Sequence, residues 1–224
     1  MKVVFLGQAG LLFEKNGFKI MIDPYLSDSV ERINPRNYRR VPVDDRFLKI
    51  TPDILIFTHN HLDHYDPETV KHFITEHSNI TVLAPKSVWD DVRKIGGNNN
   101  YILFNLHTQW TENDVVFTAV KAEHSDSTPI GIIIDDGQNK YYVTGDTLYN
   151  EEIFDDIPGD IFALFLPVNG VGNNMNMTDA ARFAKRINAK KVVPVHIGMF
   201  DELTADNFAC ENKVIAEIYK EIRL

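Results

Sequence analysis

The chain has 224 residues, of which 44% are hydrophobic and 25% charged, and its formal net charge is −9. This composition is typical of a globular protein and predicts a single domain spanning residues 1–224. The acidic balance argues against a nucleic-acid-binding protein with a basic surface, and no apolar run approaches the ~18 residues that a membrane-spanning helix needs.

Short apolar runs rich in Val, Ile and aromatic residues recur along the chain and predict β-strands. Asn16-Gly17 and Asp136-Gly137 lie between such runs and predict tight hairpins, because both turn residues accept a positive φ. The predicted strands cover residues 3–13, 19–23, 54–57, 81–84, 101–106, 115–122, 130–134, 141–144, 161–168 and 191–195.

Helical patterns are fewer. Asp66 can cap a helix that has Pro67 at its first position, and Thr178 can cap a second helix over residues 179–187. Two more helices are expected over residues 87–95 and 208–222. Strands joined by hairpins, together with a few helices, predict two sheets that pack together with helices outside.

Residues 25–48 show little strand or helix periodicity and contain several arginines. This segment is either a solvent-exposed excursion or a flap that binds an anion, because guanidinium groups suit phosphate. The candidate phosphate contacts are Arg32, Arg36, Arg39 and Arg40.

The most informative segment is His59-Asn60-His61-Leu62-Asp63-His64, which directly follows the apolar run 53–57. Imidazole and carboxylate ligands suit Zn²⁺, Mn²⁺ or Fe, and no thiolate is present to indicate a structural zinc site. His59 and His61 alternate along an extended segment, so their side chains point to the same side. A single ion could not bind all four of these side chains, but two neighbouring ions could.

Three further candidate ligands each end a predicted strand. These are His124, Asp146 in a Thr-Gly-Asp-Thr turn, and His196. A single histidine of this kind is more often structural, but three residues in the same context favour a shared metal site. His107 also ends an apolar run, yet its neighbours provide no matching pattern.

The chain resembles the metallo-β-lactamase superfamily of metal-dependent hydrolases. The residues that carry the resemblance are His59-x-His61-x-Asp63-His64, His124, Gly145-Asp146-Thr147 and His196, in that order. The flanking segments 5–10 and 23–30 are most similar to the L-ascorbate-6-phosphate lactonase branch, although that lactonase is much longer.

The resemblance implies an α+β fold, a four-layer αββα sandwich with the metals at one sheet edge. It implies that His59, His61 and His124 hold a first divalent ion, that Asp63, His64 and His196 hold a second, and that Asp146 bridges them. Asp23 would lie just outside the ligands. It also implies ring-like or dimeric assemblies, so a homo-oligomer is possible.

These features predict a dinuclear hydrolase that uses a metal-bound hydroxide on a small, phosphorylated sugar lactone or ester. Asp63 and Asp146 would fix the positions of the ions and the water, and the ions would be Mn²⁺ or Zn²⁺. Alternatives are a phosphodiesterase, for example on cyclic nucleotides, and a non-catalytic metal-binding or ligand-binding protein.

The polar run 169–176 follows a predicted strand and is either an ordinary turn or a substrate contact made by Asn169, Asn173 and Asn174. The expected partner is a small-molecule substrate, without nucleic acid or membrane. Cys210 has no second cysteine with which to form an internal disulfide, which favours the cytoplasm. It is expected to be a packing residue in the last helix.

Overall fold

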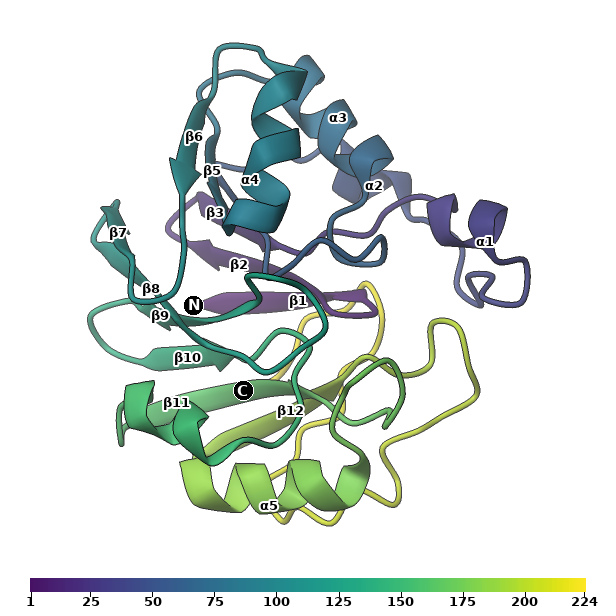
Figure 1. The fold of residues 1–224 in the computed structure, drawn as a ribbon, viewed down its shortest axis with the longest axis vertical. Helices are drawn as coiled ribbons and strands as arrows, with labels where there is room; N and C mark the ends of the chain where they lie inside the picture. Colours follow the sequence, from purple (N-terminus) through teal and green to yellow (C-terminus); the bar gives the residue numbers. More distant parts are fainter.

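The computed structural model describes residues 1–224 and has two six-stranded sheets packed face to face at its centre (Figure 1). The first sheet has the strand order β1-β2-β3-β4-β5-β6 and the second the order β12-β11-β10-β9-β8-β7. The strands of the first sheet are β1 Lys2–Gly7, β2 Gly10–Lys15, β3 Phe18–Ile22, β4 Ile54–Ile56, β5 Thr81–Ala84 and β6 Asn100–Leu103. The strands of the second are β7 Gln109–Glu112, β8 Val115–Lys121, β9 Ile130–Asp135, β10 Lys140–Val143, β11 Ile161–Pro167 and β12 Lys191–Val195.

Helices cover the outer face of each sheet. Figure 1 shows α2, α3 and α4 beside the first sheet and α5 beside the second, so the predicted four-layer αββα sandwich is confirmed. The helices are α1 Ser29–Ile33, α2 Asp45–Leu48, α3 Pro67–Glu76, α4 Lys86–Val92 and α5 Met177–Ile187, with short 3₁₀ turns η1 Arg93–Ile95 and η2 Glu151–Asp156. No helix is long and apolar enough to span a lipid bilayer.

Three hydrophobic layers separate the four layers of secondary structure. The side chains of β11 show how the sequence builds them, because alternate residues of a strand point to opposite faces of a sheet. Ala163 and Phe165 belong to the core between the sheets, whereas Leu164 and Leu166 belong to the core beneath α5. A third core lies under α3 and α4.

Both predicted hairpins form, with β2 antiparallel to β3 and β9 antiparallel to β10. Strands β10, β11 and β12 are parallel. Strand β8 runs in the same direction as β10, because both are antiparallel to β9. The carboxyl ends of β8, β10, β11 and β12 therefore meet at one edge of the second sheet. The loops that follow β8, β10 and β12 carry His124, Asp146 and His196, and the other four candidate ligands follow β4 of the first sheet.

Helix caps agree with the sequence in one case and differ in another. The side chain of Asp66 accepts hydrogen bonds from the backbone of Glu68 and Thr69 at the start of α3, as predicted. The predicted Thr178 cap is wrong, because Asn176 accepts from the backbone N–H groups of Thr178 and Asp179 at the start of α5. Asparagine is the stronger cap, so the helix starts earlier than expected.

The predicted helix over residues 208–222 is wrong. This C-terminal segment is non-helical, pairs at Lys213 with Val192 of β12, and pairs at Glu221 with Val4 of β1. It therefore covers one edge of each sheet, that of β1 in the first and that of β12 in the second. Unpaired edge strands expose backbone donors and acceptors, and this pairing satisfies them.

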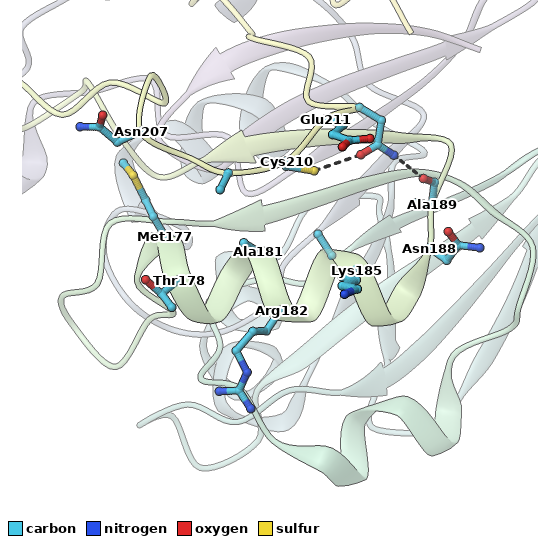
Figure 2. Close-up of a pocket in the computed structure, with 13 residues that line it drawn as sticks. Met177, Thr178, Ala181, Arg182, Lys185, Asn188, Ala189, Asn207, Cys210 and Glu211 are labelled. Atoms are coloured by element: carbon cyan, nitrogen blue, oxygen red, sulfur yellow. Dashed lines mark hydrogen bonds between the residues drawn. The ribbon is translucent and has the colours of Figure 1, made fainter.

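A groove of about 780 Å³ lies between α5 and residues 207–212 (Figure 2). Cys210 packs against the core beneath α5, as predicted, although not on a helix. Its thiol donates to Asn212 Oδ1 over 3.0 Å, and burial raises the pKa of the thiol. None of the predicted metal ligands lines this groove.

Candidate metal centre

The seven predicted ligands lie together at the carboxyl ends of the strands, in two groups. In the first group, ligand atoms of His59, His61, His124 and Asp146 lie within 4.8 Å of one another. In the second group, those of Asp63, His64 and His196 do the same. Each group therefore has the size of a site for one divalent cation.

Asp146 faces both groups. Its Oδ1 lies 3.3 Å from His64 Nε2, and its Oδ2 lies 3.2 Å from His196 Nε2 and 3.8 Å from His124 Nε2. His61 Nδ1 lies 3.1 Å from His124 Nε2 on the first side. Asp146 therefore lies within 4 Å of histidines from both groups.

The turn before Asp146 requires glycine. Gly145 has a φ of +62°, and a Cβ there would lie 2.9 Å from Ile130 O and from Thr58 Cβ. The backbone of the strand end therefore packs directly against the segment that carries His59. This close approach brings the ligand from β10 next to the ligands that follow β4.

Buried Asp23 orients two of the histidines. Its Oδ2 lies 2.8 Å from His64 Nδ1 and accepts a hydrogen bond from Thr58 Oγ1, which in turn lies 3.0 Å from His59 Nδ1. His124 Nδ1 lies 3.1 Å from the carbonyl of Asn173. Such outer partners fix the tautomer of a histidine that binds metal through its other nitrogen.

The inner nitrogens of His59 and His64 make no hydrogen bond in the protein, although Asp146 Oδ1 lies 3.3 Å from His64 Nε2. Both Nε2 atoms are buried without a hydrogen bond. An unpaired buried polar atom costs about 1–3 kcal/mol, so such atoms are rare unless a ligand satisfies them. These two atoms therefore fit a metal ion that the protein residues surround.

The electrostatics of the two sides differ. Burial lowers the pKa of His196, but the carboxylates of Asp146 and Asp63 outweigh burial and raise it to about 10. In His59, burial and the neighbouring His64 hold the pKa well below its usual value. The carboxylates of Asp63 and Asp146 therefore favour positive charge around His196, whereas His59 presents a neutral imidazole.

Comparison with known proteins identifies the family. The model of the beta-lactamase superfamily domain matches residues 19–197, a stretch that contains all seven residues of the two groups. The chain belongs to the β-lactamase superfamily. It is 27% identical to a UPF0173 protein of Pyrococcus furiosus over 217 residues, covering 94% of this chain and 90% of that protein. It is 28% identical to a UPF0173 metal-dependent hydrolase of Carboxydothermus hydrogenoformans, covering 92% of this chain and 88% of that protein.

Solved structures share the β-lactamase superfamily fold of this chain. The novel metallo hydrolase Igni18 from Ignicoccus hospitalis superposes with a TM-score of 0.77 at 20% identity, over 98% of this chain and 96% of that chain. An isothiocyanate hydrolase from Delia radicum gut bacteria superposes with a TM-score of 0.76 at 16% identity, over 100% of this chain and 99% of that chain. At these identities the likeness concerns the fold alone.

The three asparagines predicted to contact substrate lie against the candidate metal ligands. Asn174 is buried, donates from Nδ2 to Asp146 Oδ2 over 2.8 Å, and accepts from the Thr147 backbone over 3.0 Å. Asn173 contributes its carbonyl to His124, and Asn169 Nδ2 lies 3.0 Å from His196 Nδ1. The run 169–176 thus contacts the candidate ligands, and substrate binding by these asparagines stays a prediction.

Three of the four arginines predicted to contact a phosphate have partners within the protein. Arg39 is buried and donates to the carbonyl of Tyr25 over 2.8 Å and to the hydroxyl of Tyr219 over 2.7 Å, so its role is structural and the prediction of a phosphate contact there is corrected. Arg32 pairs with Glu68, and Arg40 pairs with Glu202 over 3.1 Å. Arg36 is exposed, and its side chain has no ion-pair partner.

Gln8 belongs to the site, although the sequence analysis did not place it there. Its Nε2 donates to Asp63 Oδ2 over 2.8 Å, and its carbonyl accepts from the backbone of His196 over 2.7 Å. It has a φ of +53° directly after β1. Its position at a strand end was a usable signal, but a single glutamine has no motif that indicates metal chemistry.

Proposed function

We propose that this member of the β-lactamase superfamily is a hydrolase that holds two divalent cations and cleaves an ester or lactone bond in a small molecule. The observation that carries the proposal is the position of Asp146 between one group of three histidines and a second group formed by Asp63, His64 and His196. The relative from Carboxydothermus hydrogenoformans is named a metal-dependent hydrolase, which supports the same reaction class.

The donor atoms favour Zn²⁺ or Mn²⁺, because all are imidazole nitrogens or carboxylate oxygens and no thiolate contributes. When bound, such cations lower the pKa of water towards neutrality and polarise a substrate carbonyl. Asp63 and Asp146 would supply the negative charge that retains the cations. Gln8 and Asn174 would hold these carboxylates in place through the hydrogen bonds described above.

The test of the proposal combines metal analysis with a substrate panel. Protein purified without added metal is expected to contain divalent ions, and a chelator should abolish hydrolysis until Mn²⁺ or Zn²⁺ is restored. The panel contains phosphorylated and neutral sugar lactones and cyclic nucleotides, each with the two metals separately. If the protein hydrolyses only the cyclic nucleotides, it is a phosphodiesterase and not a lactonase. If it binds metal but hydrolyses nothing in the panel, the proposal that it is an enzyme is contradicted.

We further propose a phosphorylated sugar lactone as the substrate, in line with the resemblance of the flanking segments to the lactonase branch. Arg36 is the guanidinium best able to contact the phosphate, because Arg32, Arg39 and Arg40 already have partners.

Replacing Arg36 with alanine is expected to raise KM for a phosphorylated lactone about tenfold, since hydrogen bonds to charged groups contribute about 1.5–3 kcal/mol. KM for the neutral lactone should not change. Steady-state kinetics with both substrates measures this. Arg186→Ala, which removes an exposed arginine from α5, is the control and should change neither value. An equal change in KM for both lactones would show that Arg36 does not contact the phosphate.

A further inference from the structure

His196 faces two carboxylates with one ring nitrogen and the amide of Asn169 with the other. Its Nε2 lies 3.2 Å from Asp63 Oδ2 and 3.2 Å from Asp146 Oδ2. Its Nδ1 lies 3.0 Å from Asn169 Nδ2, whereas Gln8 Nε2 is about equally far from both ring nitrogens, 3.1 Å from Nδ1 and 3.0 Å from Nε2. Nε2 is therefore the nitrogen that can bind a cation together with the carboxylates.

This choice of nitrogen determines what Nδ1 needs. A neutral histidine that offers the lone pair of Nε2 carries its hydrogen on Nδ1, so Nδ1 requires an acceptor. Both nearby amide atoms are nitrogens, which also donate. With the Asn169 amide oriented as it is in the structure, its Nδ2 donor would face the Nδ1–H donor of His196.

The two amides differ in their freedom to turn. Gln8 Nε2 also donates to Asp63 Oδ2 over 2.8 Å, so its carboxylate partner fixes its orientation. Asn169 has no such constraint, because its Oδ1 is buried without any hydrogen-bond partner. The oxygen and nitrogen of an amide have nearly the same shape, and the hydrogen-bond network decides between them. Rotating the Asn169 amide by half a turn places Oδ1 at Nδ1 of His196.

We propose that Asn169 is a positioning residue that accepts the Nδ1–H of His196 through its Oδ1 and so keeps Nε2 available for the second cation. The inference rests on the proposed function, because it concerns how the chain holds that cation. Other histidines of the site have comparable acceptors, namely Asp23 for His64 and the carbonyl of Asn173 for His124. The backbone of Asn169 is itself held by a bridge to Asn176, which caps α5.

The test measures binding of Zn²⁺ alone, by competition with a chelating dye, in Asn169→Leu and Asn169→Asp. Leucine removes the acceptor, so the second Zn²⁺ should bind about 10–100-fold more weakly, the range found when such outer partners are removed. Aspartate keeps an oxygen acceptor, so the affinity should stay within a few-fold of the unsubstituted protein. Val171→Asp is the control, since it adds the same charge to the same loop on a side chain that is 63% exposed.

A second measurement observes the hydrogen directly. In Zn²⁺-loaded protein with ¹⁵N-labelled histidine, the Nδ1–H signal of His196 should be present in the unsubstituted protein and in Asn169→Asp. It should be lost to solvent exchange in Asn169→Leu. Melting curves of the metal-free variants establish that each one folds.

Three outcomes would overturn the inference. One is unchanged Zn²⁺ affinity in Asn169→Leu, and another is equal weakening in Asn169→Leu and Asn169→Asp, which would mean that the oxygen is not what matters. The third is equal weakening in Val171→Asp and Asn169→Leu. If instead the unsubstituted protein binds no second Zn²⁺, the proposed function itself fails, a result that does not depend on any variant.

Discussion

Replacing Asp146 with asparagine is expected to lower kcat/KM by at least about 10³-fold, because cations can lower the pKa of bound water from 15.7 to about 7 and this replacement weakens their retention. Asparagine keeps the size of the side chain and one carbonyl acceptor but removes the negative charge. That charge lies between His64 Nε2 and His196 Nε2, at 3.3 Å and 3.2 Å. Kinetics on the best substrate of the panel, together with metal content by mass spectrometry, measures both effects.

The control for this prediction is a buried aspartate outside the site. Asp136 accepts backbone hydrogen bonds from Gln138 and Asn139 in the turn between β9 and β10. Asp136→Asn should lower thermal stability and leave kcat/KM per folded molecule unchanged. An Asp146→Asn variant that retains both its metal content and its activity would show that this carboxylate does not hold the cations together.

The two-sheet fold and the ligand positions could be predicted because their signals are local. Most strands are short apolar runs that end at a turn residue, β7 Gln109–Glu112 being an exception that the prediction missed, and the groups in His59–His64 are adjacent in sequence. His124, Asp146 and His196 follow strand ends, and the topology brings those ends to one edge. The lone His107 also follows a strand-like run, but it lies on the surface and contacts Asp156. A strand end alone is therefore not sufficient.

The partners of polar side chains could not be predicted, because they come from distant parts of the chain. Arg39 is bound by Tyr25 and Tyr219, the second of which is 180 residues away in sequence. Asn174 meets Asp146 across the loops that follow β10 and β11. In sequence, arginines in an irregular segment and asparagines in a turn look the same whether they face substrate, ligands or backbone.

The C-terminal segment shows a tertiary effect that outweighs a local pattern. Its apolar residues suggested a helix, but Val214, Ala216 and Ile218 alternate towards the core between the sheets. Backbone groups of the edge strands supply the pairing, as in the bond from Tyr219 N to Phe5 O over 2.7 Å. A helix would leave the edges of β1 and β12 without backbone pairing. Nothing in the local sequence of the segment indicates this loss of free energy.

Ile222 and Ile215 provide a matched test of this segment, because the same residue type can be changed in the same way at both positions. They are seven residues apart, which places them on the same face of a helix but on opposite faces of an extended chain. In the structure Ile222 is 5% exposed and Ile215 is 55% exposed.

Ile222→Ala should therefore lower the free energy of unfolding by about 2–4 kcal/mol, the cost of truncating a buried aliphatic side chain. Ile215→Ala should change it by less than about 0.5 kcal/mol, as for an ordinary surface position. Urea unfolding followed by circular dichroism measures both values, and similar losses at the two positions would mean that the segment is helical in solution and leaves the edges of β1 and β12 unpaired.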